Sequence, residues 1–343
     1  MKIEKRVLLA PLTTFGIGGK ARFFCRVKTT DELSGAVMFA EKSKFPFLIL
    51  GGGSNVLISD KGFPGLVIKI EILGMEFIER GKTIEVVAGA GESWDELVRL
   101  CVERGIGGLE NLSGIPGTVG AAPIQNIGAY GVEFADSAKW VEVFDTKKQS
   151  IRTLSRRECR FGYRDSIFKQ DGPSLVVTRV ALEFPENASP NLSYADVKEY
   201  FQKQKNKHPD IKAVRDAILE IRSRKFPDLE VVGTAGSFFK NPIVGNAKYK
   251  SLRRKYPGLV GFPVGKSKTK LSLAWIIDHV CKLKALRAGE TGVAPHQTLV
   301  LCNFGSATSA EVRVLARKIA DAVYDTTGIE IEPEVRIIPD KKL

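Results

Sequence analysis

The sequence predicts a globular protein that is built from both helices and strands and divided into two or three domains. Its 343 residues are long for a single hydrophobic core. The composition, 43% hydrophobic and 27% charged, is typical of a soluble globular protein. Helical and strand-like patterns of apolar residues both recur along the chain, and a glycine-rich stretch over residues 107–131 lies among them.

Capping boxes mark the starts of three predicted helices, each with a hydroxyl residue followed three positions later by glutamate: Thr29 with Glu32, Ser93 with Glu96, and Thr308 with Glu311. We expect the first helix to run from about 30 to 43, the second to stop at Gly105 and the third to close at Gly328. Further helices are predicted over 210–223, where apolar residues recur on one face, and over 271–280.

Short apolar or alternating runs predict the strands, and two of them, 139–145 and 150–154, are expected to form a hairpin around Thr146 and Lys147. The other predicted strands are 47–50, 56–58, 66–70, 75–79, 83–88, 175–184, 299–303 and 329–338. Residues 194–207 are polar and basic, and we predict no packed element there.

The stretch 107–131 holds seven glycines and two prolines but one charged residue, Glu110. Flexible linkers combine glycine with serine and charge, whereas here apolar residues such as Ile115 and Val119 are interleaved with the glycines. We therefore predict a folded loop whose backbone amides face a ligand. The alternative is a glycine-rich crossing between two layers of a core.

A second glycine turn, GGGSN at residues 51–55, follows a predicted strand and is typical of backbone amides that are presented to phosphate. The Rossmann pattern fails because Val56 stands where its third glycine is required. The P-loop pattern fails because the closing Gly-Lys-Ser/Thr is missing. Phosphate binding remains a hypothesis without either of these two folds.

Cysteine and histidine usage argues against disulfide and metal sites. The five cysteines are scattered without a CxxC pair, and the three histidines are far apart. We expect free thiols and no metal. No apolar run approaches the ~20 residues of a membrane helix, and the run before Pro11 is too short for a signal peptide. The protein is expected to be cytoplasmic and not to bind a membrane.

The net charge is +13, with a pI of about 9.4. This charge fits a nucleic-acid surface, capture of a small polyanion such as a nucleotide diphosphate, or an unspecific property of the source proteome. The densest basic run, residues 198–225, lacks the aromatic interleaving that stacks bases. We therefore expect no nucleic acid partner.

Five segments, in this order, closely resemble the UDP-N-acetylenolpyruvoylglucosamine reductase family: LGGGSNVLISD from residue 50, GIPGTVGAAPIQNIGAYGVE from 114, CRFGYRDSIFK from 159, AGSFFKNP from 235, and EPEVR from 332. The resemblance spans Thr14 to Arg336, and LSYADV at 192–197 resembles the form that carries a mobile tyrosine loop.

The resemblance implies an α+β fold with an FAD-binding domain of the vanillyl-alcohol oxidase (PCMH) type. The implied division is an FAD-binding subdomain at 1–70, a second at 71–187 and a C-terminal α+β substrate-binding domain at 188–343. The members of this family are flavoprotein oxidoreductases of peptidoglycan synthesis. The resemblance implies that this chain likewise oxidises NADPH and reduces an enolpyruvyl ether to UDP-N-acetylmuramate through noncovalent FAD. A monomer is expected, with the UDP-sugar and NADPH as its small-molecule partners.

The resemblance also assigns roles to residues. Arg164 would be the cation beside the substrate carboxylate, Ser237 the proton donor and Glu334 the group that completes stabilisation of the intermediate. The implied FAD contacts are Gly51, Gly52, Gly53, Ser54, Asn55, Ile115, Pro116, Gly117, Thr118, Gly120, Gln125, Asn126, Gly128, Ala129 and Tyr130. The implied UDP-sugar contacts are Tyr194, Lys225, Asn241 and Gln297.

Some alternatives remain open. VAPHQTLV at 293–300 matches the family loosely, so Gln297 rests on a weak match, and Lys225 lies in a basic helix tail where lysines are usually solvated. The same fold also serves oxidases of other small alcohols or acids, and the scaffold is compatible with nucleotide-sugar binding without turnover. The Arg164, Ser237 and Glu334 set favours the reductase over both.

Overall fold

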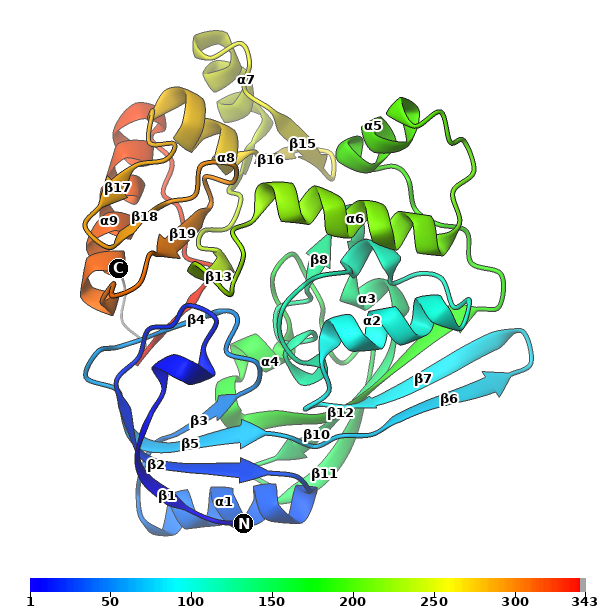
Figure 1. Ribbon diagram of the computed structural model, residues 1–343, viewed down its shortest axis with the longest axis vertical. Coiled ribbons are helices and arrows are strands. Elements are labelled where there is room, and N and C mark those ends of the chain that lie inside the picture. Colours follow the sequence, from blue (N-terminus) through cyan, green and yellow to red (C-terminus); the bar gives the residue numbers. More distant parts are fainter. Residues whose placement is uncertain (340–343) are drawn as a thin grey trace. The chain divides into compact units, whose positions relative to one another are not determined.

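The computed structural model describes residues 1–339, and their contacts form two compact units (Figure 1). Unit 1 contains Met1–Val7, Ala21–Gly52 and Pro64–Ser223. Unit 2 contains Leu8–Lys20, Gly53–Phe63 and the chain from Arg224 onward. The three-part division at 70 and 187 stays a prediction, and residues 340–343 of its last domain lie outside the described residues.

Two sheets form the framework of unit 1. The first has the order β1–β2–β5–β3, with β1 Glu4–Leu8, β2 Lys20–Val27, β5 Phe63–Ile70 and β3 Phe47–Leu50. The second has the order β11–β10–β12–β7–β6, with β11 Ser150–Ser155, β10 Ala138–Asp145, β12 Leu175–Pro185, β7 Thr83–Gly89 and β6 Met75–Arg80. Its strands are antiparallel, and the predicted hairpin of β10 and β11 is confirmed.

The capping boxes predict the helices of unit 1 well. α1 spans Thr30–Lys42, and Thr29 accepts a hydrogen bond from the Glu32 amide at 3.2 Å. α2 spans Trp94–Glu103 and is capped in the same way by Ser93. The apolar faces of both helices are buried in one core with side chains of both sheets. The short helices α3 Phe134–Ser137 and α4 Ile167–Gln170 complete this part of the unit.

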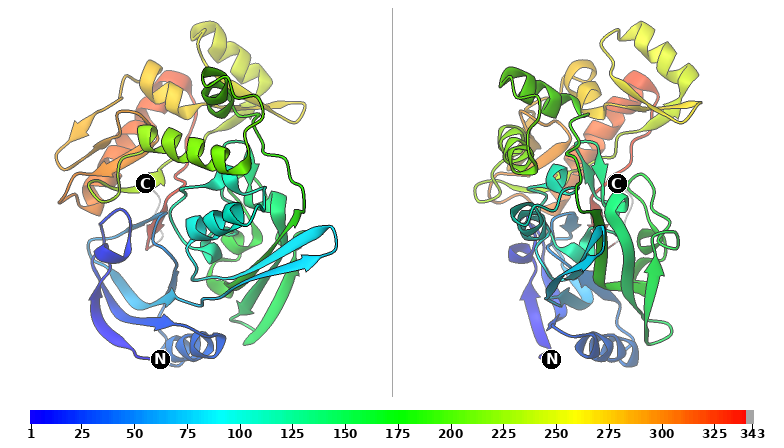
Figure 2. Two further views of the ribbon diagram at one scale, coloured as in Figure 1. Left: turned by 45° about the vertical axis from the view of Figure 1, so that its right-hand side comes forward. Right: turned by 90° about the vertical axis from the view of Figure 1, so that its right-hand side faces the viewer.

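One sequence expectation in unit 1 is wrong. Residues 194–207 were expected to lack a packed element, yet α5 runs from Ala195 to Lys203. Val197 and Phe201, four positions apart, are buried against α6 (Ile211–Lys225), and Figures 1 and 2 show the two helices next to each other. Two apolar residues at this spacing are enough to pack the helix although its other positions are polar.

Unit 2 combines small sheets with helices. One sheet has the order β13–β19–β18–β17 and another β14–β16–β15. Their bounds are β13 Gly233–Ser237, β19 Val300–Asn303, β18 Thr291–Val293, β17 Arg287–Ala288, β14 Ile243–Gly245, β16 Lys268–Leu271 and β15 Gly261–Val264. The helices are α7 Asn246–Lys255, α8 Leu273–Trp275 with a π-turn over Ile276–Val280, and α9 Ser309–Thr327. The capping box of Thr308 and the left-handed closure at Gly328 are both confirmed.

The predicted strand over 329–338 is only partly correct. β20 covers Arg336–Ile338 and pairs in parallel with β4, Val56–Ile58. Before it, Pro333 makes an isolated bridge with Phe239. Proline has no N–H to donate to a ladder, and here the pairing is limited to this single bridge. The irregular segment brings Glu334 close to the end of β13, as described below.

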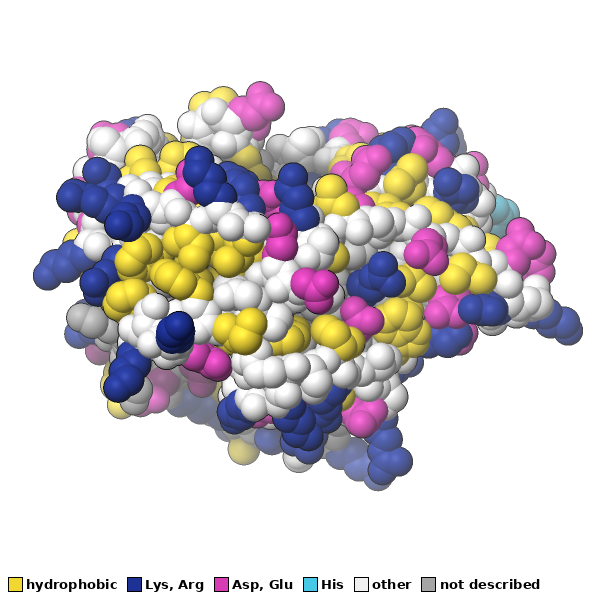
Figure 3. Space-filling view, turned by 90° about the horizontal axis from the view of Figure 1, so that it is seen from below, with side chains coloured by type: hydrophobic (Ala, Val, Ile, Leu, Met, Phe, Trp, Pro, Cys, Tyr) yellow, Lys and Arg dark blue, Asp and Glu magenta, His cyan; other side chains and the backbone are white. Residues whose placement is uncertain are grey.

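Basic side chains are not gathered into one patch on the face seen in Figure 3. Lysine and arginine occur on all sides of this face, with acidic and apolar side chains between them. This face therefore offers no continuous basic stripe for a nucleic acid.

Two valines of α9 provide a matched test of packing in unit 2. Val312 is fully buried and Val314 is 71% exposed. Val312→Ala should lower the free energy of unfolding by about 2 kcal/mol, because it leaves a cavity in a packed core. Val314→Ala, the same chemical change, should alter it by less than about 0.5 kcal/mol. Urea unfolding followed by circular dichroism measures both, and equal effects would contradict the packing described for α9.

Candidate active site

Two glycine segments of unit 1 pack directly against each other. A Cβ atom on Gly51 would lie 2.5 Å from Thr118 Oγ1, and one on Gly52 would lie 2.7 Å from the Cα of Gly117. Any other residue would overlap these atoms, so glycine is needed for the close approach. Thr118 Oγ1 is buried and has no hydrogen-bond partner among residues 1–339. Because an unpartnered buried hydroxyl is costly, this atom indicates a ligand group that completes its hydrogen bonds.

The glycine-rich stretch is a folded loop, as predicted, with the short turns η2 Glu110–Leu112 and η3 Val119–Ala121. Some of its amides are used within the protein: Val119 donates to the Glu92 carbonyl at 2.8 Å and Gly120 to the Ala90 carbonyl at 2.9 Å. These two amides hold the loop on its neighbours and are not available to a ligand. Gly120 also packs closely against Ala90: a Cβ atom added at Gly120 would lie 2.5 Å from the Cβ of Ala90.

Asn126 fixes the second half of this loop from inside. It is 1% exposed and has a φ of +46°, a left-handed conformation that asparagine tolerates. Its Nδ2 donates to Glu133 Oε2 at 2.7 Å and to the Gly162 carbonyl at 3.1 Å, and its Oδ1 accepts from the Ala135 amide at 2.9 Å. The side chain thus connects the loop to α3 and to the segment that precedes Arg164.

Arg164 lies against the same loop. Its Nη2 donates to the Gly128 carbonyl at 2.7 Å and its Nη1 to the Asn126 carbonyl at 3.4 Å. Its backbone has a φ of +53°, and Lys169 Nζ donates to its carbonyl at 3.1 Å. The guanidinium is half-buried, and these two hydrogen bonds orient its planar fork along the loop.

Tyr130 lies at the end of the loop and joins it to α6. It is 7% exposed, has a φ of +48°, and forms a hydrogen bond through its hydroxyl with Arg222. Arg222 Nε also donates to the Gly114 carbonyl at 3.1 Å. Burial raises the pKa of Tyr130 to about 12, so its hydroxyl stays protonated at neutral pH. The Tyr194 ring meets the Tyr130 ring edge-on, with centroids 5.3 Å apart.

In unit 2, main-chain hydrogen bonds bring Ser237 and Glu334 onto adjoining segments. Ser237 ends β13 after a bulge at Gly236, which has a φ of +69°. The Glu334 amide donates to the carbonyl of Phe238, the residue next to Ser237, at 2.7 Å. Asn55 Nδ2 donates to the Glu334 carbonyl at 3.2 Å. Three predicted site residues, 237, 334 and 55, therefore lie on segments that these hydrogen bonds join.

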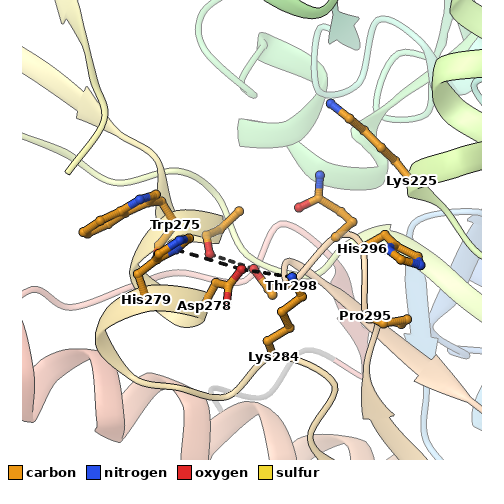
Figure 4. Close-up of a pocket in the computed structure, with 10 residues that line it drawn as sticks. Lys225, Trp275, Asp278, His279, Lys284, Pro295, His296 and Thr298 are labelled. Atoms are coloured by element: carbon orange, nitrogen blue, oxygen red, sulfur yellow. Dashed lines mark hydrogen bonds and ion pairs between the residues drawn. The ribbon is translucent and has the colours of Figure 1, made fainter. Parts of the chain in front are cut away.

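A pocket of about 240 Å³ in unit 2 contains two of the predicted UDP-sugar contacts, Lys225 and Gln297. Figure 4 shows Lys225 on one side and the pair Trp275 and His279 on the other. These two rings stack at 4.8 Å with an interplanar angle of 4°. The remaining lining residues are Ala274, Asp278, Lys284, Pro295, His296 and Thr298.

Asn241 lies beside the element that lines this pocket. Its Oδ1 accepts a hydrogen bond from the Leu273 amide at 2.9 Å, at the start of α8, while Thr298 Oγ1 donates to the Ala274 carbonyl at 2.8 Å. The pocket wall is thus fixed by side chains from two segments. Two lysines, Lys225 and Lys284, and one carboxylate, Asp278, line the pocket, and Lys284 pairs with Asp278 at 3.4 Å.

Two segments of the chain match known protein families, and the whole chain is similar to known enzymes. Residues 21–155 match the family described as FAD binding domain, and residues 227–338 match the one described as UDP-N-acetylenolpyruvoylglucosamine reductase, C-terminal domain. A UDP-N-acetylenolpyruvoylglucosamine reductase of Pseudomonas aeruginosa is 40% identical over 97% of this chain and 98% of its own. One of Chromobacterium violaceum is 41% identical over 98% of this chain and 99% of its own.

The chain belongs to the UDP-N-acetylenolpyruvoylglucosamine reductase family. A solved structure agrees with this assignment: the crystal structure of the reductase (MurB) from Thermus caldophilus matches with a TM-score of 0.71 and 29% identity. That match covers 99% of this chain and all of the other. The predicted fold class, an FAD-binding domain followed by a reductase C-terminal domain, is confirmed.

The residues of unit 1 fit an FAD site of this reductase family. The close-packed glycines provide a surface without side chains, and Thr118 Oγ1 provides a buried polar atom that lacks a protein partner within residues 1–339. The other predicted cofactor contacts lie within the same loop, except for residues 53–55, which lie in unit 2. The individual contacts remain predictions.

The five cysteines are free thiols, and burial raises the pKa of Cys25, Cys101 and Cys159 to about 12. Within residues 1–339 no group of three or more potential ligands could hold a metal ion. No helix in that part of the chain is both long and apolar enough to cross a membrane.

Sequence reasoning missed several residues that the structure brings to these sites, among them Arg222 and Asn111. Arg222 follows Ile218 by four positions, so it lies on the buried face of α6 and not in a solvated basic tail. That spacing was a usable signal. No local sequence signal points to Asn111, because the two residues to which it donates hydrogen bonds lie 19 and 80 positions away.

Thr118 and Thr178 allow a matched test of the cofactor site. Thr118→Val should weaken FAD binding about tenfold, while apoprotein stability is unchanged or raised, because the lost hydroxyl has no protein partner. Thr178 is fully buried, but its hydroxyl donates to Glu142 Oε1 at 2.7 Å. Thr178→Val should therefore lower stability by about 1 kcal/mol and leave FAD affinity unchanged. Flavin titration measures the FAD affinity of each variant, and urea unfolding measures its stability. A stability loss in Thr118→Val without a loss of FAD affinity would contradict the assignment of Thr118 to the cofactor site.

Glycine substitutions test the close approach. Gly52→Ala should abolish retention of FAD, because the new Cβ would overlap the backbone of Gly117. Gly35 lies in α1 with nothing within 4 Å of its Cβ position. Gly35→Ala is the control, and it should keep FAD and gain roughly 0.5–1 kcal/mol of stability. The absorbance ratio at 450 and about 280 nm of the purified variants reports FAD content; normal content in Gly52→Ala would refute the close-packing argument.

Proposed function

We propose that this chain catalyses the NADPH-dependent reduction of the enolpyruvyl ether of UDP-N-acetylglucosamine to UDP-N-acetylmuramate, a step of peptidoglycan precursor synthesis. The family assignment supports this proposal over nearly the full length of the chain. The structural observation that most supports it is the hydrogen bond from the Glu334 amide to the carbonyl next to Ser237. It brings the proposed proton donor and the proposed carboxylate onto neighbouring segments.

FAD, when bound, carries the hydride from NADPH to the vinyl carbon of the substrate. The chain itself has to orient the substrate and stabilise the negative charge that develops on the substrate's carboxyl side. Arg164 is proposed to bind that carboxylate, because a planar guanidinium suits bidentate contact. Its hydrogen bonds to the Asn126 and Gly128 carbonyls fix the orientation of the guanidinium beside the loop.

Ser237 is proposed to deliver the proton that completes the reduction. A serine hydroxyl is a poor acid in water, but an enolate is a strong enough base to accept its proton. The bulge at Gly236 sets the orientation of Ser237 at the strand end. Glu334 is proposed to act as the protonated acid or through water, because an ionised carboxylate would repel the enolate.

The UDP-sugar is proposed to contact Tyr194, Lys225, Asn241 and Gln297. The pocket that Lys225 and Gln297 share supports this for two of the four. Asn241 uses its oxygen to cap α8, so it would contact the substrate through its amide nitrogen. We further propose that the enzyme acts as a cytoplasmic monomer with NADPH and the UDP-sugar as its partners, and size-exclusion chromatography with light scattering tests the oligomeric state.

The test of the proposed function is the visible spectrum before and after anaerobic NADPH, followed by the enolpyruvyl UDP-sugar. An oxidised flavin spectrum should bleach with NADPH and return when the sugar is added. A colourless protein that cannot be reconstituted with FAD would refute the proposal. Rapid reoxidation by oxygen with no response to the sugar would instead indicate an oxidase.

Ser237→Ala separates the two halves of the reaction. It should leave reduction of bound FAD by NADPH nearly unchanged and slow the reaction with the enolpyruvyl sugar by at least about 100-fold, because only the second half needs the proton. Stopped-flow absorbance measures each half alone. An equal loss in both halves would mean that Ser237 has a structural role only.

Arg164→Lys and Arg164→Met distinguish charge from fork geometry. Both should lower kcat/KM for the sugar, the methionine variant by about 100-fold or more and the lysine variant by less, because lysine keeps the charge but not the bidentate contact. Steady-state kinetics with purified FAD-loaded variants measures this. Equal losses would indicate that the fork, and not the charge, is the essential property; no loss in either would exclude Arg164 from the site.

A further inference from the structure

Asn111 forms an unusual junction inside unit 1. Its side chain is fully buried, and Nδ2 donates both of its hydrogens to main-chain carbonyls, to Tyr130 at 2.9 Å and to Asn191 at 2.9 Å. Two carbonyl partners fix which atom is the nitrogen. Oδ1 is buried without a hydrogen-bond partner among residues 1–339. The site thus keeps an amide at the cost of an unpaired oxygen, which indicates that its two donors are needed.

The segment reached by the second hydrogen bond leads directly to Tyr194. Asn191 Nδ2 donates back to the Gly131 carbonyl at 3.3 Å. Its Oδ1 accepts from the Ser193 amide at 3.0 Å and from the Ser193 hydroxyl at 2.7 Å. These bonds shape the turn that ends at Tyr194, the residue before α5.

The Tyr130 end of the junction is held just as firmly. Its carbonyl accepts from Asn111, its hydroxyl bonds with Arg222, and its ring meets the ring of Tyr194. Tyr194 is itself 39% exposed, so this ring contact alone cannot hold it in one place. The hydrogen bonds of Asn111 and Asn191 determine where the segment attaches.

We propose that Asn111 is a positioning residue, which attaches the segment 191–194 to the carbonyl of Tyr130 and so presents Tyr194 to the substrate. Asn111 acts through Tyr194 and does not touch the substrate. The proposal rests on the proposed function, in which Tyr194 contacts the UDP-sugar. Leucine at position 111 has the same number of side-chain heavy atoms but no donors, so Asn111→Leu removes both bonds and leaves the two carbonyls without these donors.

The first measurement is hydrogen exchange of peptides that cover residues 189–197 in the FAD-loaded enzyme. Asn111→Leu should increase exchange there at least about tenfold, and Asn206→Ala, an exposed asparagine beyond α5, should not. Unchanged exchange in Asn111→Leu would overturn the proposal. If Asn111→Leu does not fold, Asn111→Ala removes the same two donors without adding bulk and gives the same test.

The second measurement is a double-mutant cycle on the KM of the UDP-sugar. Asn111→Leu should raise this KM about tenfold when Tyr194 is present, and less than about twofold in a Tyr194→Ala background, with FAD content unchanged. A tenfold rise in both backgrounds would overturn the proposal, because it would show a structural effect that does not pass through Tyr194. Increased exchange with no KM effect of Tyr194→Ala itself would support the attachment and refute the substrate contact of Tyr194.

Discussion

Buried asparagine side chains hold together the parts of this protein that have neither helix nor strand. Backbone amides and carbonyls in such segments have no ladder to pair with, and leaving them unpaired inside the protein is costly. A carboxamide offers donors and an acceptor on one short side chain. Asn126 does this for the second half of the glycine-rich loop, and Asn303 does it in unit 2, donating to the Phe15 carbonyl and accepting from the amides of Gly305 and Ala307.

The pairing of buried backbone groups by side chains explains why the site segments can hold one conformation although they form neither helix nor strand. Tyr130 and Arg164 are not glycines, yet both have positive φ, a conformation that costs energy for residues with a Cβ. Lys44 and Gln149 also have positive φ, but they lie in surface turns after a helix and between two strands. The Tyr130 carbonyl accepts a hydrogen bond from the Asn111 side chain, and the Arg164 side chain donates to the Gly128 carbonyl, so both conformations are held in place. Strain that is held in this way at the candidate site is consistent with a functional requirement for that backbone shape.

Local signals in the sequence predict much of the fold. The capped helices α1, α2 and α9 are predictable because the hydroxyl and glutamate that start each of them are three residues apart. α5 is not, because the only apolar signal in a polar segment is the pair Val197 and Phe201, and its helical state depends on packing against α6. The strand predicted before β20 does not form as one continuous element; at Pro333 the backbone makes an isolated bridge with Phe239. What depends on distant partners cannot be inferred from neighbouring residues.

The residues of the candidate site also differ in whether the sequence alone could locate them. Glycines, Arg164, Ser237 and Glu334 belong to long motifs, so the resemblance to the reductase family locates them from the sequence alone. The residues that hold them carry no such signature. Asp95 illustrates the difference: it accepts from the Gly114 amide and pairs with the buried Arg215 at 2.8 Å. Burial alone would raise its pKa, but the hydrogen bonds from Arg215 and Gly114 outweigh burial and lower it. A carboxylate that stays ionised here links α2, α6 and the start of the glycine-rich loop, so an apparently ordinary helix residue contributes to the shape of the cofactor site.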